Sequence, residues 1–201
     1  SSLARKNPEG VIAAFRRAFS DDPGARLILK TQRLAGMPEA AARLRALLSP
    51  TIELRDATLD DAGIAALYGE ADVLLSLHRA EGFGLAPAEA MRRGVPPVAT
   101  DWSGSTDFVS AEVGIPVPYH LVPAEDPQRT YHHPDQRWAE PDVDAAAAAL
   151  RALRDEPAMR ARLGEAAARY AATHWNAEAY AARLRAIGVP EFAAMLRGEL
   201  T

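Results

Sequence analysis

Residues 72–100 read DVLLSLHRAEGFGLAPAEAMRRGVPPVAT, and this stretch predicts a strand, a glycine turn, a helix and a second strand. Its first six residues form the short apolar run that is typical of a strand covered on both faces. The helix is expected to begin at Ala86 or Pro87 and to end at Gly94, and Val95–Thr100 is the next strand. Two strands joined through a helix are expected to lie parallel in one sheet.

The alternation of helix and strand extends in both directions from this stretch. Asn7, Pro8 and Glu9 combine an N-cap, a proline at the first helical position and an acid in the first turn, which predicts a helix start. The expected helices cover Pro8–Phe19, Pro38–Leu48 and Asp60–Gly69, and the further strands cover Arg26–Lys30, Thr51–Leu54 and Gly114–Tyr119. This order predicts an α/β fold with a Rossmann-like, doubly wound, mostly parallel sheet and helices on both faces.

The last third of the chain is expected to differ from this pattern. After Tyr119 we expect a proline- and histidine-containing loop that runs to about Trp138. Helical spacing then predicts helices over Asp142–Asp155, Pro157–Thr173 and Asn176–Ile187, with a further short helix after Pro190. We therefore expect one domain over residues 1–201, with its core at about 1–173 and a helical C-terminal extension at about 174–201.

Composition excludes several classes of protein. A formal net charge of −4 and a pI of about 5.8 argue against a nucleic-acid binder. The absence of cysteine excludes disulfides and thiolate metal sites and agrees with a cytoplasmic location, and attachment to a membrane surface stays open. His132 and His133, with His120 and Asp135 nearby, match no common metal spacing, so we expect no metal site.

Two glutamates frame the glycine turn. Glu81 is expected at the carboxyl edge of the sheet, where ligands bind in doubly wound folds, and Glu89 lies one turn into the helix. Gly82 and Gly84 permit a tight turn with close backbone approach. A carboxylate accepts hydrogen bonds from two vicinal hydroxyls, so Glu89 would suit a ribose and Glu81 a hexopyranose. By spacing alone, a solvated helix face and a structural turn are the favoured explanation of the pair.

A longer set of residues favours a ligand site over these structural explanations. Ser76–Thr100, with its two glutamates, the following Ala-Met, the helix-ending glycine and the Pro-Val strand, closely resembles the donor-binding signature of the family 4 nucleotide-sugar glycosyltransferases, also called glycosyl transferases group 1. The segments that agree in order are Arg5–Pro8, Ala71-Asp72, Trp102–Gly104 with Asp107-Phe108, and Trp138–Asp142. The resemblance covers nearly all of the chain. It implies the C-terminal, donor-binding half of a GT-B architecture, with the N-terminal acceptor domain absent from this chain.

The resemblance also implies roles for individual residues. Lys6, with Arg5, would contact the donor diphosphate, Glu81 would hold the donor-sugar hydroxyls and Glu89 the ribose. Glu81 and Lys6 are thus the expected catalytic residues. The backbone that would cradle phosphate is that of Gly82, Phe83, Gly84, Leu85 and Ala86, and the loop Thr58–Asp61 would border the base. His78 has either a donor-side role or a structural role in the turn.

The implied reaction is transfer of a hexosyl group, with retention of configuration, from a UDP, GDP or dTDP sugar to a glycan or glycolipid in cell-surface polysaccharide biosynthesis. Neither a cofactor nor a metal is expected in the site. The isolated domain should bind its donor but barely catalyse, and the missing domain is a candidate for peripheral membrane association at the inner face. The alternative is a non-catalytic nucleotide- or sugar-binding or interaction module. An NAD-dependent oxidoreductase is disfavoured because no G-x-G-x-x-G follows a strand.

Overall fold

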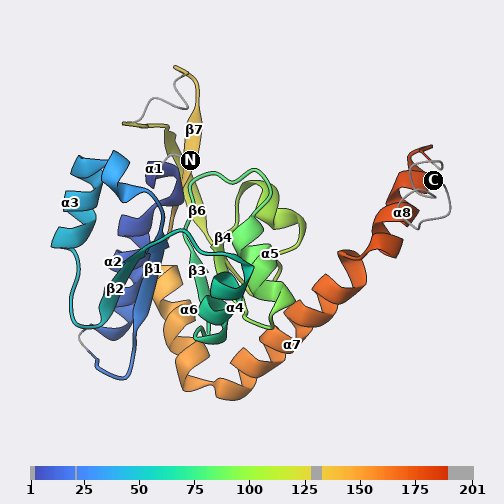
Figure 1. Cartoon of the computed structure of the whole chain (residues 1–201), viewed down its shortest axis with the longest axis horizontal. Coiled ribbons are helices and arrows are strands. Elements are labelled where there is room, and N and C mark those ends of the chain that lie inside the picture. Colours follow the sequence, from blue (N-terminus) through green and yellow to red (C-terminus); the bar gives the residue numbers. More distant parts are fainter. Residues whose placement is uncertain (1–2, 21, 128–132, 190–201) are drawn as a thin grey trace.

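The computed structural model of the chain describes residues 3–20, 22–127 and 133–189 (Figure 1). Its helices are α1 Leu3–Lys6, α2 Pro8–Phe19, the 3-10 helix η1 Leu34–Gly36, α3 Pro38–Ala46, α4 Asp61–Gly69, α5 Leu85–Arg92, the 3-10 helix η2 Ser103–Asp107, α6 Val143–Asp155, α7 Pro157–His174 and α8 Ala177–Ala186. Its strands are β1 Leu27–Thr31, β2 Ile52–Asp56, β3 Leu74–Ser76, β4 Pro97–Thr100, β5 Ile115–Val117, β6 Tyr119–Pro123 and β7 Arg137–Pro141.

The predicted parallel α/β fold is confirmed. β1 pairs with β2, and β4 lies between β3 and β5, with every one of these pairs parallel. The pairs form two separate hydrogen-bonded units, and one buried apolar cluster joins them. This cluster contains Leu29 of β1, Ile52 of β2, Val98 of β4 and Val117 of β5. Burial of these side chains, rather than backbone hydrogen bonds, therefore holds the two units together.

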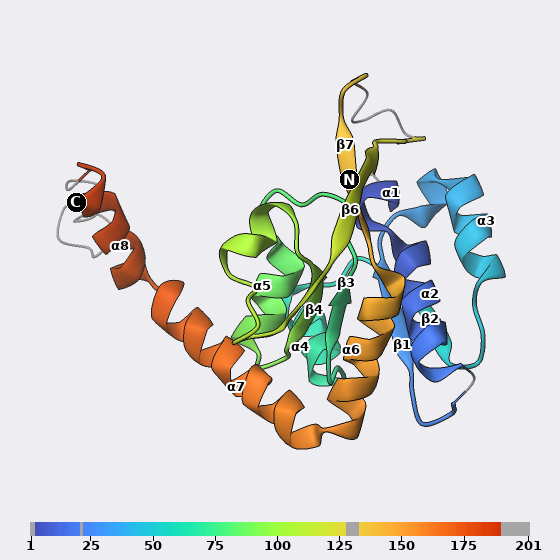
Figure 2. The ribbon, with the colours of Figure 1, turned by 180° about the vertical axis from the view of Figure 1, so that it is seen from behind.

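Helices cover both faces of the strands (Figures 1 and 2). α4 and α5 lie on the face seen in Figure 1, whereas α2 and α6 lie on the face seen in Figure 2, where they pack against each other. Ala146 and Ala149 of α6 are buried in the same cluster as Phe15 of α2, which small side chains permit by letting helix axes come close. The alanine run of this helix is thus a packing surface.

The C-terminal helices follow the expected spacing. α7 packs against α5, and its Gly164 lies so close to Gly94 that a Cβ there would sit 2.1 Å from the carbonyl oxygen of Gly94. α8 contacts α7 and extends away from the strands (Figure 1). The short helix predicted after Pro190 lies outside the described residues. Within the described part of the chain, no helix has both the length and the apolar character to span a bilayer.

One prediction of local structure was wrong, and one short helix was missed. The segment after Tyr119 was expected to be a loop, but β6 and β7 form an antiparallel hairpin in which Tyr119 pairs with Pro141 and Pro123 with Arg137. Pro123 and Pro141 are tolerated because the bonds between the strands are made by the residues that follow them, Ala124 and Asp142, so neither proline has to donate to the other strand. The short helix α1, directly before α2, was not predicted, because four residues are too few to show a period.

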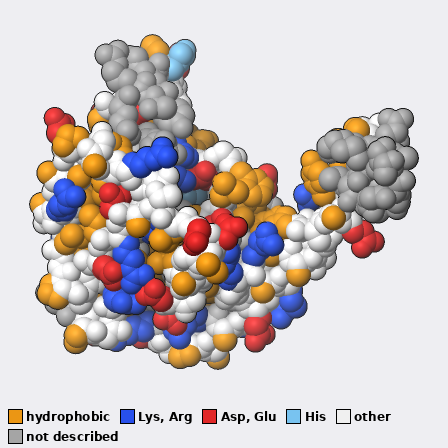
Figure 3. Space-filling view, viewed as in Figure 1, with side chains coloured by type: hydrophobic (Ala, Val, Ile, Leu, Met, Phe, Trp, Pro, Cys, Tyr) orange, Lys and Arg blue, Asp and Glu red, His pale blue; other side chains and the backbone are white. Residues whose placement is uncertain are grey.

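Charged side chains of both signs are interspersed over the surface. Figure 3 shows Lys and Arg next to Asp and Glu across the face that carries α4 and β2. On β2 and at the end of α4, for example, Arg55 donates hydrogen bonds to both Glu53 and Glu70. Such exposed pairs contribute little stability each, about 0 to 1 kcal/mol.

Candidate functional site

Two cationic residues lie at the junction of α1 and α2. Arg5 and Lys6 form the last turn of α1, and Asn7 begins α2 with a left-handed backbone (φ 53°). The Asn7 side-chain oxygen accepts a hydrogen bond from the Gly10 amide at 3.1 Å, as the predicted N-cap requires. The backbone of Asn7 therefore separates α1 from α2 and fixes the direction in which Arg5 and Lys6 project.

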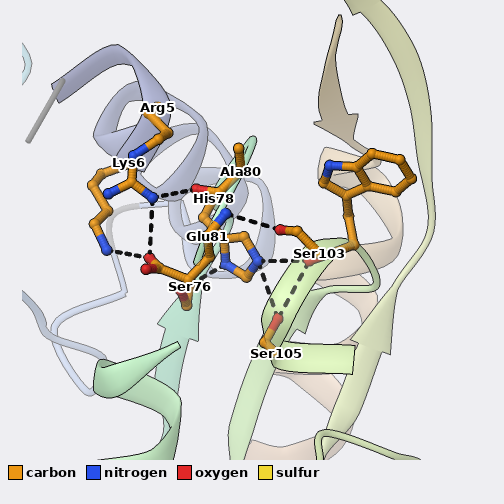
Figure 4. A network of polar contacts seen from close by, with 9 residues as sticks. Arg5, Lys6, Ser76, His78, Ala80, Glu81, Ser103 and Ser105 are labelled. Carbon is orange, nitrogen blue, oxygen red and sulfur yellow. Dashed lines mark hydrogen bonds and ion pairs between the residues drawn. The ribbon is translucent and has the colours of Figure 1, made fainter. Parts of the chain in front are cut away.

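The loop that follows β3 runs beside this junction (Figure 4). The Arg79 amide donates to the carbonyl of Arg5 at 2.8 Å, and the Arg5 guanidinium donates to the carbonyl of Ala80 at 2.5 Å. The Arg5 side chain is buried although it is charged. Burial of a guanidinium requires such partners, so Arg5 is part of the framework of the site rather than a free surface cation.

Glu81 is the centre of an ion-pair cluster. Its carboxylate pairs with the Lys6 ammonium and lies 3.4 Å from the Arg5 guanidinium, and its side chain is only 13% exposed. Burial by itself raises the pKa of Glu81, but the hydrogen bond from Lys6 and the positive charges of Lys6 and Arg5 outweigh it and lower the pKa below its ordinary value. Glu81 is thus held as a carboxylate.

The loop after β4 supports Glu81 from the other side. The Glu81 amide donates to the Ser103 hydroxyl at 2.8 Å, and the Gly104 amide donates to the Glu81 carbonyl at 3.0 Å. A Cβ at Gly104 would lie 2.0 Å from the carbonyl oxygen of Gly82, so only glycine allows the two loops to approach this closely. The carboxyl ends of β3 and β4 therefore meet at Glu81.

His78 joins the same loops from inside the protein. It is 1% exposed, and its Nε2 lies 3.2 Å from the Trp102 carbonyl oxygen and 3.1 Å from the Ser105 hydroxyl. Because a carbonyl only accepts, Nε2 carries the proton, and Nδ1 then accepts from the Ser76 hydroxyl at 3.1 Å. Burial lowers the pKa of His78. The ring is therefore engaged by the chain itself, and its geometry is that of a structural link between β3 and β4.

The glycine turn ends at the start of α5. Gly84 has a left-handed backbone (φ 97°) at the N-cap, and a Cβ there would lie 3.1 Å from both Phe108 and Ser105. No side chain caps this helix, so the first amides, those of Leu85 and Ala86, carry the partial positive charge of the helix start. Gly82 differs, since a Cβ there would meet nothing within 4 Å. A side chain is therefore excluded at Gly84 by its neighbours and its backbone, whereas at Gly82 the close contact is that of its carbonyl with Gly104.

Apolar side chains of the turn face outward. Phe83 is 50% exposed and Leu85 is 68% exposed, although both belong to the motif. The Phe83 ring is not isolated, because it lies 5.4 Å from the ring of Phe108, centre to centre. Phe83 therefore presents its outer face beside the backbone amides of the turn.

Glu89 lies in a second cluster, against α4. Its carboxylate is 3.5 Å from the Tyr68 hydroxyl, which donates to the Ala86 carbonyl at 3.0 Å. Burial, followed by the negative charge of Glu89, raises the pKa of Tyr68 to about 12. Glu89 thus contacts Tyr68 rather than Arg5 or Lys6.

The loop Thr58–Asp61, which was expected to border a base, leads into α4. In this loop the Asp60 side chain caps α4 by accepting a hydrogen bond from the Gly63 amide at 2.8 Å.

Sequence reasoning missed the part of the site that distant segments supply. The link from the Ser103 hydroxyl to Glu81 and the contacts of Arg79 with α1 depend on tertiary packing, and no local pattern marks them.

In the described ranges, 3–20, 22–127 and 133–189, no three His, Asp or Glu side chains are grouped so that they could hold a metal ion. His132, one of the residues considered above as a possible metal ligand, lies outside those ranges.

A family model described as "Family 4 Glycosyltransferase in conflict systems" matches residues 6–184. The chain belongs to this glycosyltransferase family. The match includes Lys6, the β3–α5 motif and helices α6 and α7, and it begins one residue after Arg5. A search of curated proteins found no match.

Solved glycosyltransferase structures share the fold of this family 4 chain. The C-terminal domain of the group 1 glycosyltransferase LpcC from Francisella tularensis aligns with a TM-score of 0.63 at 19% identity, over 86% of this chain and 81% of that one. Sucrose-phosphate synthase from Thermosynechococcus elongatus aligns with a TM-score of 0.69 at 24% identity, over 95% and 43%. HepE from Anabaena, in complex with UDP and glucose, aligns with a TM-score of 0.69 at 17% identity, over 100% and 47%. The chain thus spans less than half of the last two proteins and corresponds to one half of a GT-B architecture.

Proposed function

We propose that this chain is the donor-binding half of a retaining hexosyltransferase that uses a nucleoside diphosphate sugar. The observation that carries the proposal is the convergence of Lys6, Arg5 and Glu81 at the carboxyl edge of the parallel strands, beside the uncapped start of α5. Cations and helix amides suit a diphosphate, and a buried carboxylate suits sugar hydroxyls.

Lys6 is the residue suited to neutralise the leaving diphosphate. Its side chain is 42% exposed, whereas that of Arg5 is 9% exposed and bonded to the Ala80 carbonyl. Lys6 can therefore exchange the Glu81 carboxylate for a phosphate oxygen while Arg5 stays in place. Release from Lys6 leaves Glu81 able to accept hydrogen bonds from the donor sugar. Each charge-assisted hydrogen bond of this kind contributes roughly 1.5 to 3 kcal/mol.

The reaction then depends on stabilising charge at the diphosphate. As the glycosidic bond breaks, the leaving group gains negative charge, and in this proposal Lys6 and the amides of Leu85 and Ala86 stabilise that charge. Loss of one such contact slows a reaction by about 10² to 10³ when the contact acts in the transition state. Glu89, whose carboxylate is oriented by Tyr68, is the proposed partner of the ribose hydroxyls.

UDP is the first nucleotide to test, because the similar HepE structures hold UDP and UDP-glucose. For the acceptor we propose a glycan or glycolipid of cell-surface polysaccharide, bound by an N-terminal domain of the same protein, with the reaction in the cytoplasm at the inner face of the membrane. Neither a metal nor another cofactor enters the proposed chemistry. GDP and dTDP sugars are the alternatives for the donor.

A second candidate is a non-catalytic nucleotide- or sugar-binding module with the glycosyltransferase fold. It stays open because the contacts of Lys6, Arg5 and Glu81 explain binding of a ligand and do not by themselves require transfer. In this case the chain binds its ligand with the same residues, and the protein that contains it shows no transfer to any acceptor.

The test is calorimetry of this chain with UDP-glucose, GDP-mannose, dTDP-glucose and NAD. We expect binding of one sugar nucleotide, no binding of NAD, and at least about tenfold weaker binding in Lys6→Ala and Glu89→Ala, since about 1.4 kcal/mol is a factor of ten. Glu165→Ala, which changes an exposed acid on α7, is the matched control and should bind as the parent does. Absence of any sugar-nucleotide binding would overturn the proposal. Turnover by the full-length protein then separates the enzyme from the module.

A further inference from the structure

Arg79 joins three segments that are distant in the sequence. Its amide donates to the Arg5 carbonyl at 2.8 Å, and one guanidinium nitrogen donates to the Ala4 carbonyl at 3.0 Å. Its own carbonyl accepts from the Ala139 amide of β7 at 3.0 Å. The last carbonyls of a helix lack partners within the helix and carry its partial negative charge. Arg79 therefore satisfies the C-terminal end of α1, the turn that carries Lys6.

The other side of the Arg79 guanidinium faces Glu140 of β7. Nε donates to one carboxylate oxygen at 2.6 Å and Nη2 donates to the other at 3.1 Å. This two-point contact fixes the orientation of both groups, and a lysine cannot reproduce it. The two side chains are 24% and 30% exposed and form part of the wall of a cavity of about 310 Å³ together with Trp138. The pair is thus at the rim of a hollow and not packed in the apolar core.

These contacts link the β6–β7 hairpin to the ion-pair cluster. Arg79 stands two positions before Glu81, and the carbonyl groups that it holds belong to the two residues before Lys6. Without the two-point contact to Glu140, the Arg79 guanidinium would be free to rotate away from the end of α1. The separation between Lys6 and Glu81 would then depend only on the bond from the Arg79 amide to the Arg5 carbonyl and on the bond from Arg5 to the Ala80 carbonyl, and it would be less tightly fixed.

We propose that Arg79 is a positioning residue: braced by Glu140, it sets α1 against the loop after β3 so that Lys6 and Glu81 act on one sugar nucleotide. This proposal rests on the function proposed above, since it assigns to the hairpin a part in holding the donor site. Arg79 itself touches no donor atom in this role. Its side chain acts through the Ala4 carbonyl, and its backbone amide acts through the Arg5 carbonyl.

A similar ion pair elsewhere in the fold provides the control. Arg55 on β2 also makes a multiple-point contact with carboxylates, to Glu53 at 2.5 Å and to Glu70 at 2.8 Å. Its side chain is 29% exposed, close to the 24% of Arg79. Arg55→Lys therefore removes a comparable interaction at a place that does not contact α1.

The experiment compares Arg79→Lys, Glu140→Gln and Arg55→Lys in this chain. Calorimetry with UDP-glucose, or with whichever sugar nucleotide the parent binds, should show binding weakened about 5- to 30-fold in the first two variants and unchanged in Arg55→Lys. Thermal unfolding should shift by a similar, small amount in all three. The double variant Arg79→Lys with Glu140→Gln should bind no more weakly than the poorer single variant, because the two residues act as one unit.

A second readout does not need the ligand. An NMR titration of the Glu81 carboxyl should give a higher pKa in Arg79→Lys than in the parent chain, because Lys6 is no longer held beside it, and no change in Arg55→Lys. If the parent binds a sugar nucleotide while neither the affinity nor the Glu81 titration changes in Arg79→Lys and Glu140→Gln, the proposal is wrong. If the parent binds no nucleotide but the titration shifts, the positioning role stands and the proposed function fails. If Arg79→Lys does not fold, the affinity and the Glu81 titration of Glu140→Gln decide whether the proposal holds.

Discussion

The Lys6 ammonium and the Glu81 carboxylate form an ion pair that joins the end of α1 to the loop after β3. Because Glu81 is mostly buried, this pair differs from the exposed pairs of the surface, and its contribution to stability should depend on pH.

Glu81→Gln should lower stability near neutral pH and have less effect in acid. Burial raises the pKa of Glu81, but the bond and charges from Lys6 and Arg5 bring it below the ordinary value of 4.5. A folded-state pKa below the unfolded one stabilises the protein above the unfolded pKa, and this contribution is lost as the pH falls through the folded pKa. Urea unfolding should show a larger difference in the free energy of unfolding between parent and variant at about pH 7 than at about pH 4. Glu165→Gln should show no such trend, and an equal difference at both pH values would contradict the assignment.

His78→Gln should destabilise the fold by about 1 to 3 kcal/mol, because it leaves buried hydrogen-bonding groups of the two loops unpaired. Burial lowers the pKa of His78 from 6.5, so the folded state binds its proton less well than the unfolded state does. The parent should therefore lose stability as the pH falls below 6.5, and the variant should lose less. Denaturant unfolding across this range measures both effects. His120→Gln, at an exposed position of β6, is the control and should keep the pH trend of the parent.

Gly84→Ala should destabilise the chain by about 1 to 3 kcal/mol, because its backbone is left-handed and a Cβ would press on Phe108 and Ser105. Gly82→Ala, two positions earlier, should change stability by less than about 0.5 kcal/mol, because nothing lies within reach of the added methyl group. Chemical unfolding of both variants tests the contrast. Equal losses would show that the two glycines serve the turn in the same way.

Gly164→Ala should also destabilise the fold, although alanine by itself favours a helix more than glycine does. Alanine is favoured over glycine inside a helix by about 1 kcal/mol. In α7, however, the added methyl group would lie 2.1 Å from the Gly94 carbonyl oxygen, so α7 must move away from α5. Thermal unfolding should show a lower midpoint. Gly69→Ala, at the open end of α4, has no atom within 4 Å and should leave the midpoint unchanged or raise it.

The parallel fold could be predicted because its signals are local. The apolar run before the glycine turn became β3, and Asn7, Asp60 and Asp142 each cap the helix that their position predicts. Boundaries moved by a few residues where a strand continues into a loop, as at β3, which ends at Ser76 instead of Leu77.

The hairpin and the details of the site could not be predicted in the same way. β6 and β7 are short, contain prolines and pair across a long connection, so neither strand shows a pattern of its own. The proximity of Lys6 and Glu81 was expected from the family resemblance and not from spacing. The direct ion pair between them, and the bracing of Arg79 by Glu140, arise only when distant segments pack.

Two backbone hydrogen bonds hold the base of the hairpin, one to the loop after β3 and one between its own two strands. Ala139 donates to the Arg79 carbonyl at 3.0 Å, and Asp142 donates to the Pro118 carbonyl at 2.8 Å. The described residues 124–127 and 133–136 lie beyond these two bonds. An epitope or a fluorescent peptide inserted at either of these segments would leave both bonds in place, so the protein could be tagged or immobilised there without disturbing the proposed donor-binding edge.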